Sequence, residues 1–321
     1  MGRFLTTAAM GAALAMLAFA PARAWQAEKV DAANYPPEIV VESRAAAADG
    51  LPDGLIATSS GTVAQAWYGN PTRRYDHGVL GDAIEAGSLH VRLGNGRTAR
   101  LILPHTEVFE DRAPRLADLD GNGTTEIITI RSSLAKGASV TVYGIENGAI
   151  VEKATTGFYG RKHRWLNIAA IAPFLGIAGN EIAFVATPHL GGTLFVMRYA
   201  RGTLVQVAAG RDFSNHVIGS RELRLSAVAD VDADGRMELA LPSADRTALR
   251  IVGAAAGKAA AIQGGNTTIV LPPGAVEQGG LREIARIGLP AAIDKAIGIE
   301  TEGRKGFVVG LENGEVYLIH P

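Results

Sequence analysis

A strand, a glycine-bearing turn and a second strand recur along most of the chain, and this repeat restricts the fold more than any other feature. The turn glycines are separated by 35, 52, 54, 55 and 57 residues, and they are Gly61, Gly96, Gly148, Gly202, Gly257 and Gly314. Three of them belong to Asn-Gly pairs, which tolerate the positive φ angles of tight hairpins. A period of about 50 residues with about four strands per repeat is typical of the radial blades of a propeller.

The predicted fold is therefore all-β, a single β-propeller over residues 38–321. About six blades of roughly four antiparallel strands are expected, with five to seven as the alternatives. Glycine is in excess, at 39 of 321 residues, as many tight turns require. The absence of cysteine excludes disulfide bonds, thiolate metal ligands and a catalytic thiol.

The first 24 residues have the pattern of a secretory signal peptide. Arg3 precedes a charge-free apolar run over residues 4–20, and the segment ends in the small-residue cleavage site Ala22-Arg23-Ala24. Cleavage is predicted before Trp25, and the polar residues 25–37 are predicted to be a mobile lead-in. No later apolar run is long enough for a membrane helix. The mature protein is predicted to be exported, periplasmic or secreted, and not embedded in a membrane.

Charge excludes one class of partner. Lys plus Arg total 31 and Asp plus Glu total 32, so the net charge is −1. Proteins that bind nucleic acid through its phosphates usually carry a basic excess, so no nucleic-acid partner is expected. The sequence also contains no G-x-S-x-G, H-E-x-x-H, Walker or G-x-G-x-x-G motif. Catalysis by residues gathered from separate blades stays open.

The sharpest motif is an acidic loop that occurs twice, at residues 118–126 and 230–238, which are 112 residues apart. Each copy has side-chain oxygens at positions 1, 3, 5 and 9, glycine at position 6 and a main-chain carbonyl at position 7. Oxygen ligands on a flexible loop suit Ca²⁺ better than Mg²⁺. Two calcium ions are predicted, with the ligands Asp118, Asp120, Asn122, Thr124 and Glu126 in one site, and Asp230, Asp232, Asp234, Arg236 and Glu238 in the other.

Three other interpretations of these loops were weighed. An EF-hand needs glutamate at position 12, where this chain has Thr129 and Leu241. An aspartyl phosphatase can begin with D-x-D-G after a strand, but it needs one nucleophile in a βαβ framework. Asp, Asn and Gly also favour ordinary polar turns, and the second copy in register argues against that interpretation.

The pattern strand, D-x-D-x-[DN]-G-x-x-E, strand, preceded by Leu116-Ala117 or Val228-Ala229, resembles the FG-GAP (VCBS) repeat. The resemblance covers residues 113–152 and 225–252 and is weak elsewhere, because residues 168–186 and 284–300 lack the acidic loop. It implies an integrin-α-type propeller of an exported bacterial protein in which the loop between the first two strands of a blade binds calcium. It indicates no single function, because such repeats serve many.

A ligand is expected on the face opposite the acidic loops, where the connections between blades and the middle hairpins should meet. Aromatic and cationic groups there suit a sugar or an anionic ligand. The candidate residues are Tyr159, Arg161, His163, Trp165, His189, Asp212, Asn215 and His216. Clustered histidines that bind Zn²⁺, and solvated loops without a ligand, are the alternatives.

Two functions follow from these expectations. The first is an exported, calcium-binding propeller that acts as a binding or scaffold module for a protein or glycan at the cell envelope. The second is a propeller enzyme, a hydrolase or lyase, that acts on an extracellular polysaccharide. A deep central pocket with paired carboxylates or a histidine–arginine cluster would favour the enzyme, whereas a shallow, broad, aromatic-lined surface would favour binding.

Overall fold

The computed structural model describes residues 24–32, 47–254, 261–264, 267–270, 279–300 and 306–321. This part of the chain is all-β, and its strands pair antiparallel except for one short parallel contact. The predicted all-β class is confirmed. The described residues contain no helix long and apolar enough to cross a membrane. The predicted signal peptide, residues 1–24, lies outside the described part apart from Ala24.

The described strands form five antiparallel units of four strands each. The first unit contains β2 (Ala57–Thr58), β3 (Val63–Thr72), β4 (Glu85–Leu93) and β5 (Thr98–Ile102). The second contains β7 (Arg115–Ala117), β8 (Glu126–Ser133), β9 (Gly137–Glu146) and β10 (Ala149–Thr155). The short strand β6 (Glu107–Phe109) pairs with both β4 and β8 and joins the two units into one sheet.

The third unit contains β11 (Leu166–Ala172), β12 (Glu181–Ala186), β13 (Thr193–Ala200) and β14 (Thr203–Arg211). The fourth contains β15 (Ala227–Ala229), β16 (Glu238–Pro242), β17 (Ala248–Ala254) and β20 (Gly279–Gly288). Strands β14 and β20 make the parallel contact.

One predicted hairpin is wrong. The sequence suggests that a strand near Ile262 returns along β17 after Gly257, but β17 pairs with β20 instead. The intervening residues contain a separate hairpin of β18 (Ala261–Gly264) and β19 (Thr267–Val270). An inserted hairpin has its own turn spacing and therefore imitates the repeat. Gly257 itself lies outside the described residues.

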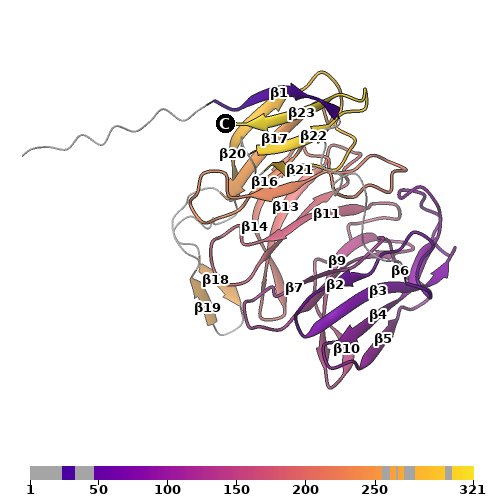
Figure 1. The fold of residues 1–321 in the computed structure, drawn as a ribbon. Coiled ribbons are helices and arrows are strands. Elements are labelled where there is room, and N and C mark those ends of the chain that lie inside the picture. The colour runs from indigo at the N-terminus through magenta and orange to yellow at the C-terminus, as the bar shows by residue number, and fades with distance from the viewer. Residues whose placement is uncertain (1–23, 33–46, 255–260, 265–266, 271–278, 301–305) are drawn as a thin grey trace, which may run out of the picture.

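The fifth unit joins the two ends of the chain. It contains β21 (Gly298–Glu300), β22 (Gly306–Gly310), β23 (Val316–His320) and β1 (Gln26–Val30). Figure 1 shows indigo β1 beside yellow β23 at the top of the molecule. The predicted mobile lead-in over residues 25–37 is thus wrong for Gln26–Val30, because the free edge of β23 offers backbone partners to a polar segment.

Hairpin chemistry explains the local turns. The three Asn-Gly pairs lie between β4 and β5, between β9 and β10, and between β22 and β23, as predicted. Asn147 and Gly148 have φ angles of 51° and 81°, which only Gly, Asn and a few other residues adopt readily. Alternate turns of an antiparallel unit lie at opposite ends of its strands. The first-to-second-strand loops and the second-to-third-strand turns therefore occupy opposite ends of each unit.

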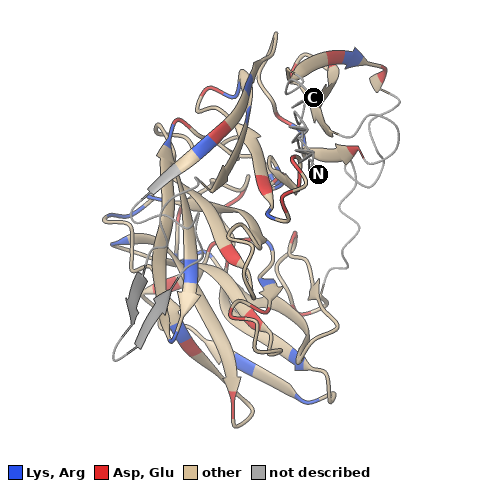
Figure 2. Ribbon diagram, turned by 90° about the vertical axis from the view of Figure 1, so that its left-hand side faces the viewer, with Lys and Arg blue, Asp and Glu red and all other residues tan. Residues whose placement is uncertain are grey.

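Apolar side chains pack between the units. One cluster of buried side chains joins the second and third units and includes Val140, Trp165, Ile182 and Phe184. The connection between β3 and β4 (residues 73–84) also contributes Val79 to this cluster. This β3–β4 connection therefore leaves its own unit. Figure 2 shows acidic and basic residues interspersed along the strands and loops of the side it displays.

Candidate functional site

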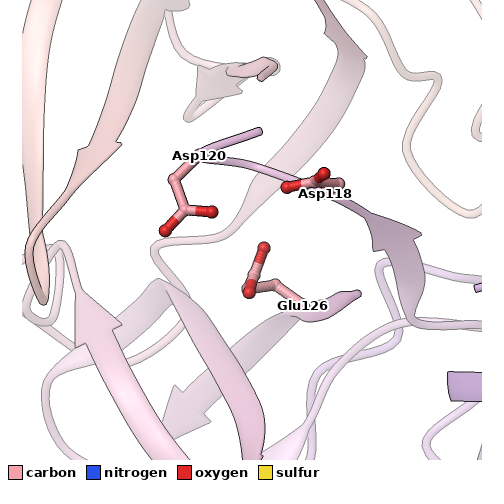
Figure 3. Close-up of side chains that lie close together, drawn as sticks. All are labelled: Asp118, Asp120 and Glu126. Carbon is pink, nitrogen blue, oxygen red and sulfur yellow. The ribbon is translucent and has the colours of Figure 1, made fainter. Parts of the chain in front are cut away.

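The first acidic loop (residues 118–126) joins β7 to β8 and brings its carboxylates together. One oxygen each from Asp118, Asp120 and Glu126 lies within 4.8 Å of the others, and Figure 3 shows the three groups around a common space. Gly121 has a φ of 76°, which permits the sharp turn. Asp118 accepts hydrogen bonds from the backbone N–H groups of Gly121 and Gly123, both at 2.8 Å, which fixes the loop.

The charges of this first acidic loop lack a cationic partner. Within the described chain, no Lys, Arg or His side chain forms an ion pair with Asp118, Asp120 or Glu126. Burial raises the pKa of Glu126, and the neighbouring Asp120 and Asp118 raise it further. A bound cation would relieve this repulsion, so the donor set fits calcium.

A cavity of about 670 Å³ opens beside the first acidic loop. Asp120, Asn122, Thr124 and Glu126 line it together with Lys153. Lys153 is paired with Glu146 on the neighbouring strand. The cavity gives the carboxylates access to solvent. Asn122 accepts a hydrogen bond from the backbone of Thr124 at 2.7 Å, and the role of the Thr124 carbonyl as a ligand stays a prediction.

The second acidic loop (residues 230–238) joins β15 to β16 and repeats the geometry. Oxygens of Asp230, Asp232 and Glu238 lie within 4.8 Å of one another. Here two guanidinium groups are present: Arg236 Nε donates to Asp234 at 3.0 Å, and Arg282 donates to Asp232 at 2.8 Å.

The guanidinium groups make the fit of a metal to the second acidic loop poorer. Burial raises the pKa of Glu238 to about 7, with Asp232 and Asp234 acting in the same direction and Arg282 against them. The side chain of Arg236, whose carbonyl was predicted as a ligand, is committed to Asp234.

A second group of side chains meets at the ends of the strands opposite the acidic loops. Trp165 stacks on His189, with ring centroids 6.1 Å apart, and meets the edge of His216 at 4.7 Å. The two histidines share a hydrogen bond of 2.9 Å between Nε2 of His189 and Nδ1 of His216. Burial lowers the pKa of each to about 4. Both rings are therefore neutral near pH 7.

Trp165 links this trio to a histidine–carboxylate pair. Its indole N–H donates to the Glu110 carbonyl at 3.1 Å. The Glu110 carboxylate contacts Nδ1 of His77 at 2.5 Å and accepts a hydrogen bond from Ser132. The His77 side chain is 18% exposed, whereas the Glu110 side chain is fully buried. His77 therefore presents its other face to solvent while a buried acid holds it. We refer to Tyr75, His77, Glu85, Glu110, His163, Trp165, His189 and His216 as the histidine cluster.

His163 stacks on one face of the His77 ring. The two rings stack with centroids 4.6 Å apart and an interplanar angle of 15°. The backbone N–H of His163 donates to the Tyr75 hydroxyl at 3.0 Å, and Nε2 of His163 pairs with Asp76 at 3.0 Å. His163 has a φ of 65°, a conformation held by these contacts.

A pair of buried carboxyl groups lies within the histidine cluster. Burial raises the pKa of Glu85, and the charge of Glu110 raises it further. Burial also raises the pKa of Glu110, but the contact with His77 opposes that shift. Two neighbouring carboxyl groups whose surroundings differ in this way favour one protonated and one ionised member.

The structure brings some of the predicted ligand residues together and buries some of them. Trp165, His189, His216 and His163 do come together, as expected for one neighbourhood. Trp165 and His216 are buried, which does not suit residues that contact a ligand from exposed loops. Asn215 is also buried; its side-chain amide donates to the backbone carbonyl of Asn167 at 3.2 Å, and the Asn167 amide donates to the backbone carbonyl of Asn215 at 3.1 Å.

The remaining candidates lie outside the histidine cluster. Tyr159 packs edge-on against Phe195 at 6.0 Å, in the apolar core. Asp212 pairs with Arg286 at 2.9 Å and accepts the backbone N–H of Ala244 at 3.2 Å. Arg161 is exposed two residues before His163.

The sequence indicates that Glu85 and Glu110 lie on the face opposite the acidic loops, but it does not identify Tyr75 and His77 as their neighbours in one site. His77 and Glu110 are 33 residues apart and belong to different connections. No local spacing identifies such a pair, although both segments carry charged residues between strands. The contact becomes visible only when the β3–β4 connection is placed across the neighbouring unit.

No family model matches the chain, and no curated protein matches it. Among solved structures, the chain is similar to the exotype rhamnogalacturonan lyase YesX, with a TM-score of 0.36, 14% identity, and coverage of 88% of this chain and 68% of that one. The rhamnogalacturonan lyase YesW has a TM-score of 0.37 and 12% identity, with coverage of 88% of this chain and 75% of that one. The Bacillus licheniformis rhamnogalacturonan lyase PL11 has a TM-score of 0.35 and 11% identity, with coverage of 87% of this chain and 74% of that one. These TM-scores are too low to support a conclusion about fold or activity.

Proposed function

We propose that this chain is an exported β-propeller enzyme that acts on a polysaccharide, with His77 as its general base. The observation that carries the proposal is the contact between the partly exposed His77 ring and the buried Glu110 carboxylate. An enzyme is the second of the two functions that the sequence left open. Paired carboxyl groups with clustered histidines favour an enzyme over a scaffold.

The five four-stranded units support the propeller. Each unit is an antiparallel meander, and β1 completes the last unit with a strand from the other end of the chain. We propose that these units are five blades, at the lower end of the expected range, and that β1 closes the ring. The FG-GAP resemblance of the second and fourth units agrees with this arrangement. The apolar run over residues 4–20 and the cleavage site support export.

Calcium is proposed as the structural cation of the first acidic loop. Asp118, Asp120 and Glu126 would hold it, and it would supply positive charge to a loop that otherwise concentrates negative charge. This site lies at the end of the strands away from the histidine cluster. No catalytic step is therefore assigned to it.

The chemistry of the site follows from the hydrogen bonds of His77. Glu110 contacts Nδ1, so it orients the ring, which leaves Nε2 to remove a proton. In a hydrolase that proton comes from water, and in a lyase it comes from the sugar carbon next to a carboxylate. The raised pKa of Glu85 makes this carboxyl a candidate proton donor.

The surroundings of His77 favour an anionic polysaccharide. Arg161 and Lys162 are exposed immediately before His163. Lys162 also lies over the Tyr75 ring, 6.0 Å from its centroid. Lys162 is paired with Asp76 and Tyr75 is buried, so the exposed Arg161 is the cationic group that would attract an acidic sugar through its charge.

The experiment is a cleavage assay on a panel of neutral and uronate-containing polysaccharides. Elimination creates a carbon–carbon double bond that absorbs ultraviolet light, whereas hydrolysis creates only new reducing ends. His77→Gln should lower kcat by at least ~100-fold, the usual contribution of a general base. His105→Gln, at an exposed position on another connection, should leave the rate unchanged. Full activity of His77→Gln would refute the assignment.

A binding module for a glycan or a protein at the envelope is the second candidate. The β3–β4 connection lies across this end of the strands, and Leu190 and Ile218 beside the histidine cluster are 62% and 67% exposed. Such a surface suits a partner that docks without reaction. Binding of a panel polysaccharide without cleavage, lost in Arg161→Ala, would favour this candidate.

A further inference from the structure

Three successive units share one anchoring hydrogen bond in the loop between their first two strands. In the second unit, Glu126 accepts the backbone N–H of Leu119 at 2.9 Å, and in the fourth unit Glu238 accepts that of Val231 at 2.9 Å. In the third unit, Glu181 accepts the N–H of Leu175 at 3.0 Å. The glutamate is thus retained even where the aspartates of the acidic loop are absent. Each of these buried glutamates needs a positive charge nearby.

In the third unit, an arginine supplies that charge. Arg198 on β13 donates to Glu181 at 2.6 Å, and its side chain is only 10% exposed. Arg198 also donates to the carbonyl of Ala178, three residues before Glu181 in the same loop. A guanidinium group therefore closes the loop of the third unit from inside the protein.

The fourth unit combines an acidic loop with an arginine in the same role. Arg282 on β20 donates to Asp232 at 2.8 Å and lies 3.9 Å from Glu238. It reaches the loop from the outermost strand of its unit. Arg236 neutralises Asp234 in addition. A calcium ion could use Asp232 and Glu238 only after displacing the Arg282 guanidinium.

The second unit has no such residue in the described chain. Its acidic loop faces the cavity that Lys153 lines, and Lys153 is committed to Glu146. Within the described chain, the three loops form a series in which a guanidinium group approaches the anchoring glutamate in two cases, and no guanidinium group does so in the second unit.

We propose that Arg282 takes the place of the metal ion in the second acidic loop, as Arg198 does in the third unit, so that the chain binds one calcium ion rather than two. This inference rests on the proposed function only in one respect: the single bound calcium ion is assumed to occupy the first acidic loop. The part that concerns Arg282 stands on its own contacts. The pattern of acidic residues in the sequence overstates the number of metal sites, because the arginine that fills the second one comes from a distant strand.

The test is calcium titration of the full mature chain by calorimetry after removal of metal with a chelator. The wild type should bind one equivalent, and Asp120→Asn should abolish that binding. Asp232→Asn should still bind one equivalent of calcium. Arg282→Gln should bind two equivalents, and the added site should disappear in the double variant Arg282→Gln with Asp232→Asn.

The matched control is Arg286→Gln. Arg286 lies on the same strand, is 48% exposed compared with 41% for Arg282, and pairs with Asp212 outside the acidic loop. Arg286→Gln should bind one equivalent of calcium, as the wild type does. Circular dichroism establishes that each variant is folded, and exposed side chains of this kind are tolerated.

The outcomes separate the two proposals. Two equivalents in the wild type, or loss of the single equivalent in Asp232→Asn, would overturn the role of Arg282. No gain of binding in Arg282→Gln would overturn it as well. If the wild type binds no calcium, the site in the first acidic loop is wrong, and Arg282→Gln then decides the inference by binding one equivalent or none.

Discussion

At the scale of single residues, burial decides what the polar side chains of this chain can do. His216 is fully buried, contacts Trp165 and His189, and has a pKa lowered to about 4. His77 is partly exposed and is held by a buried carboxylate. The two histidines occur in similarly polar stretches of sequence. Their different surroundings make His216 a structural residue and His77 the candidate for chemistry.

The lowered pKa of His216 predicts a loss of stability in acid. Its folded pKa of about 4 lies below the ordinary value of about 6.5, so the unfolded chain binds the proton first. The stabilisation is complete above pH 6.5 and is lost as the pH falls toward 4. At pH 4.5 the loss from this residue is roughly 2.5 kcal/mol relative to pH 7.

Urea unfolding of wild type and His216→Asn at both pH values measures this loss. The difference in free energy of unfolding between the two proteins should shrink by that amount at the lower pH. Comparing them cancels the opposite contribution of Glu85 and Glu110, whose raised pKa values favour the folded state in acid. His105→Asn, at an exposed position, is the control. A difference that does not change with pH would contradict the assignment.

The acidic loops show which residues of a site the sequence can identify. Asp118, Asp120 and Glu126 belong to one loop, so their spacing alone predicts that their oxygens converge, and they do. His77 and Glu110 meet only through the packing of two connections, so no local pattern contains them. Arg282 escapes prediction for the same reason, because it reaches its loop from another strand.

At the scale of elements, the β3–β4 connection determines the shape of the face that carries the histidine cluster. The carbonyl of Val79 accepts the backbone N–H of Gly219 at 2.9 Å, and Arg221 pairs with Asp82 at 2.9 Å. These contacts hold residues 73–84 against the segment that leads into β15. The same connection positions His77. The sequence predicts loops at this end of the strands but not that one of them lies across another.

Close approach of two backbones makes Gly81 the sensitive position of the connection. Gly81 has a φ of 95°, and a Cβ atom there would lie 2.8 Å from the carbonyl oxygen of Gly219. Gly81→Ala should therefore lower the free energy of unfolding by about 1–3 kcal/mol. It should also lower any His77-dependent activity, because the connection would shift.

Gly78→Ala is the matched control for that change. It lies three residues earlier on the same connection, and its nearest neighbour would be 3.6 Å from the added Cβ. Urea unfolding should place this variant within about 0.5 kcal/mol of wild type. Equal stability of the two alanine variants would show that the connection does not lie close against Gly219.

At the scale of the whole molecule, the described strands repeat one four-stranded unit, and the last unit takes a strand from each end of the chain. The repeat itself was readable from the sequence because each unit carries its own turns. The pairing of β1 with β23 was not readable from the sequence, because Gln26–Val30 is polar and lacks the apolar alternation of a core strand. Its pairing depends on an edge that forms only when the rest of the molecule is folded.

The pairing of β1 with β23 gives the last prediction. A variant that begins at Asp31 loses the ladder from Gln26 to Val30 and the stacking of Trp25 on Phe307, whose ring centroids are 6.3 Å apart. Its free energy of unfolding should be at least about 2 kcal/mol lower than that of a variant beginning at Trp25. Exposure of the β23 edge should also promote aggregation. If β1 closes a ring, the fluorescence of Trp67 and Trp165, which lie outside the fifth unit, should report the same shifted midpoint as circular dichroism. An unchanged midpoint at these two tryptophans would show that the units unfold independently and that the ring is not closed by β1.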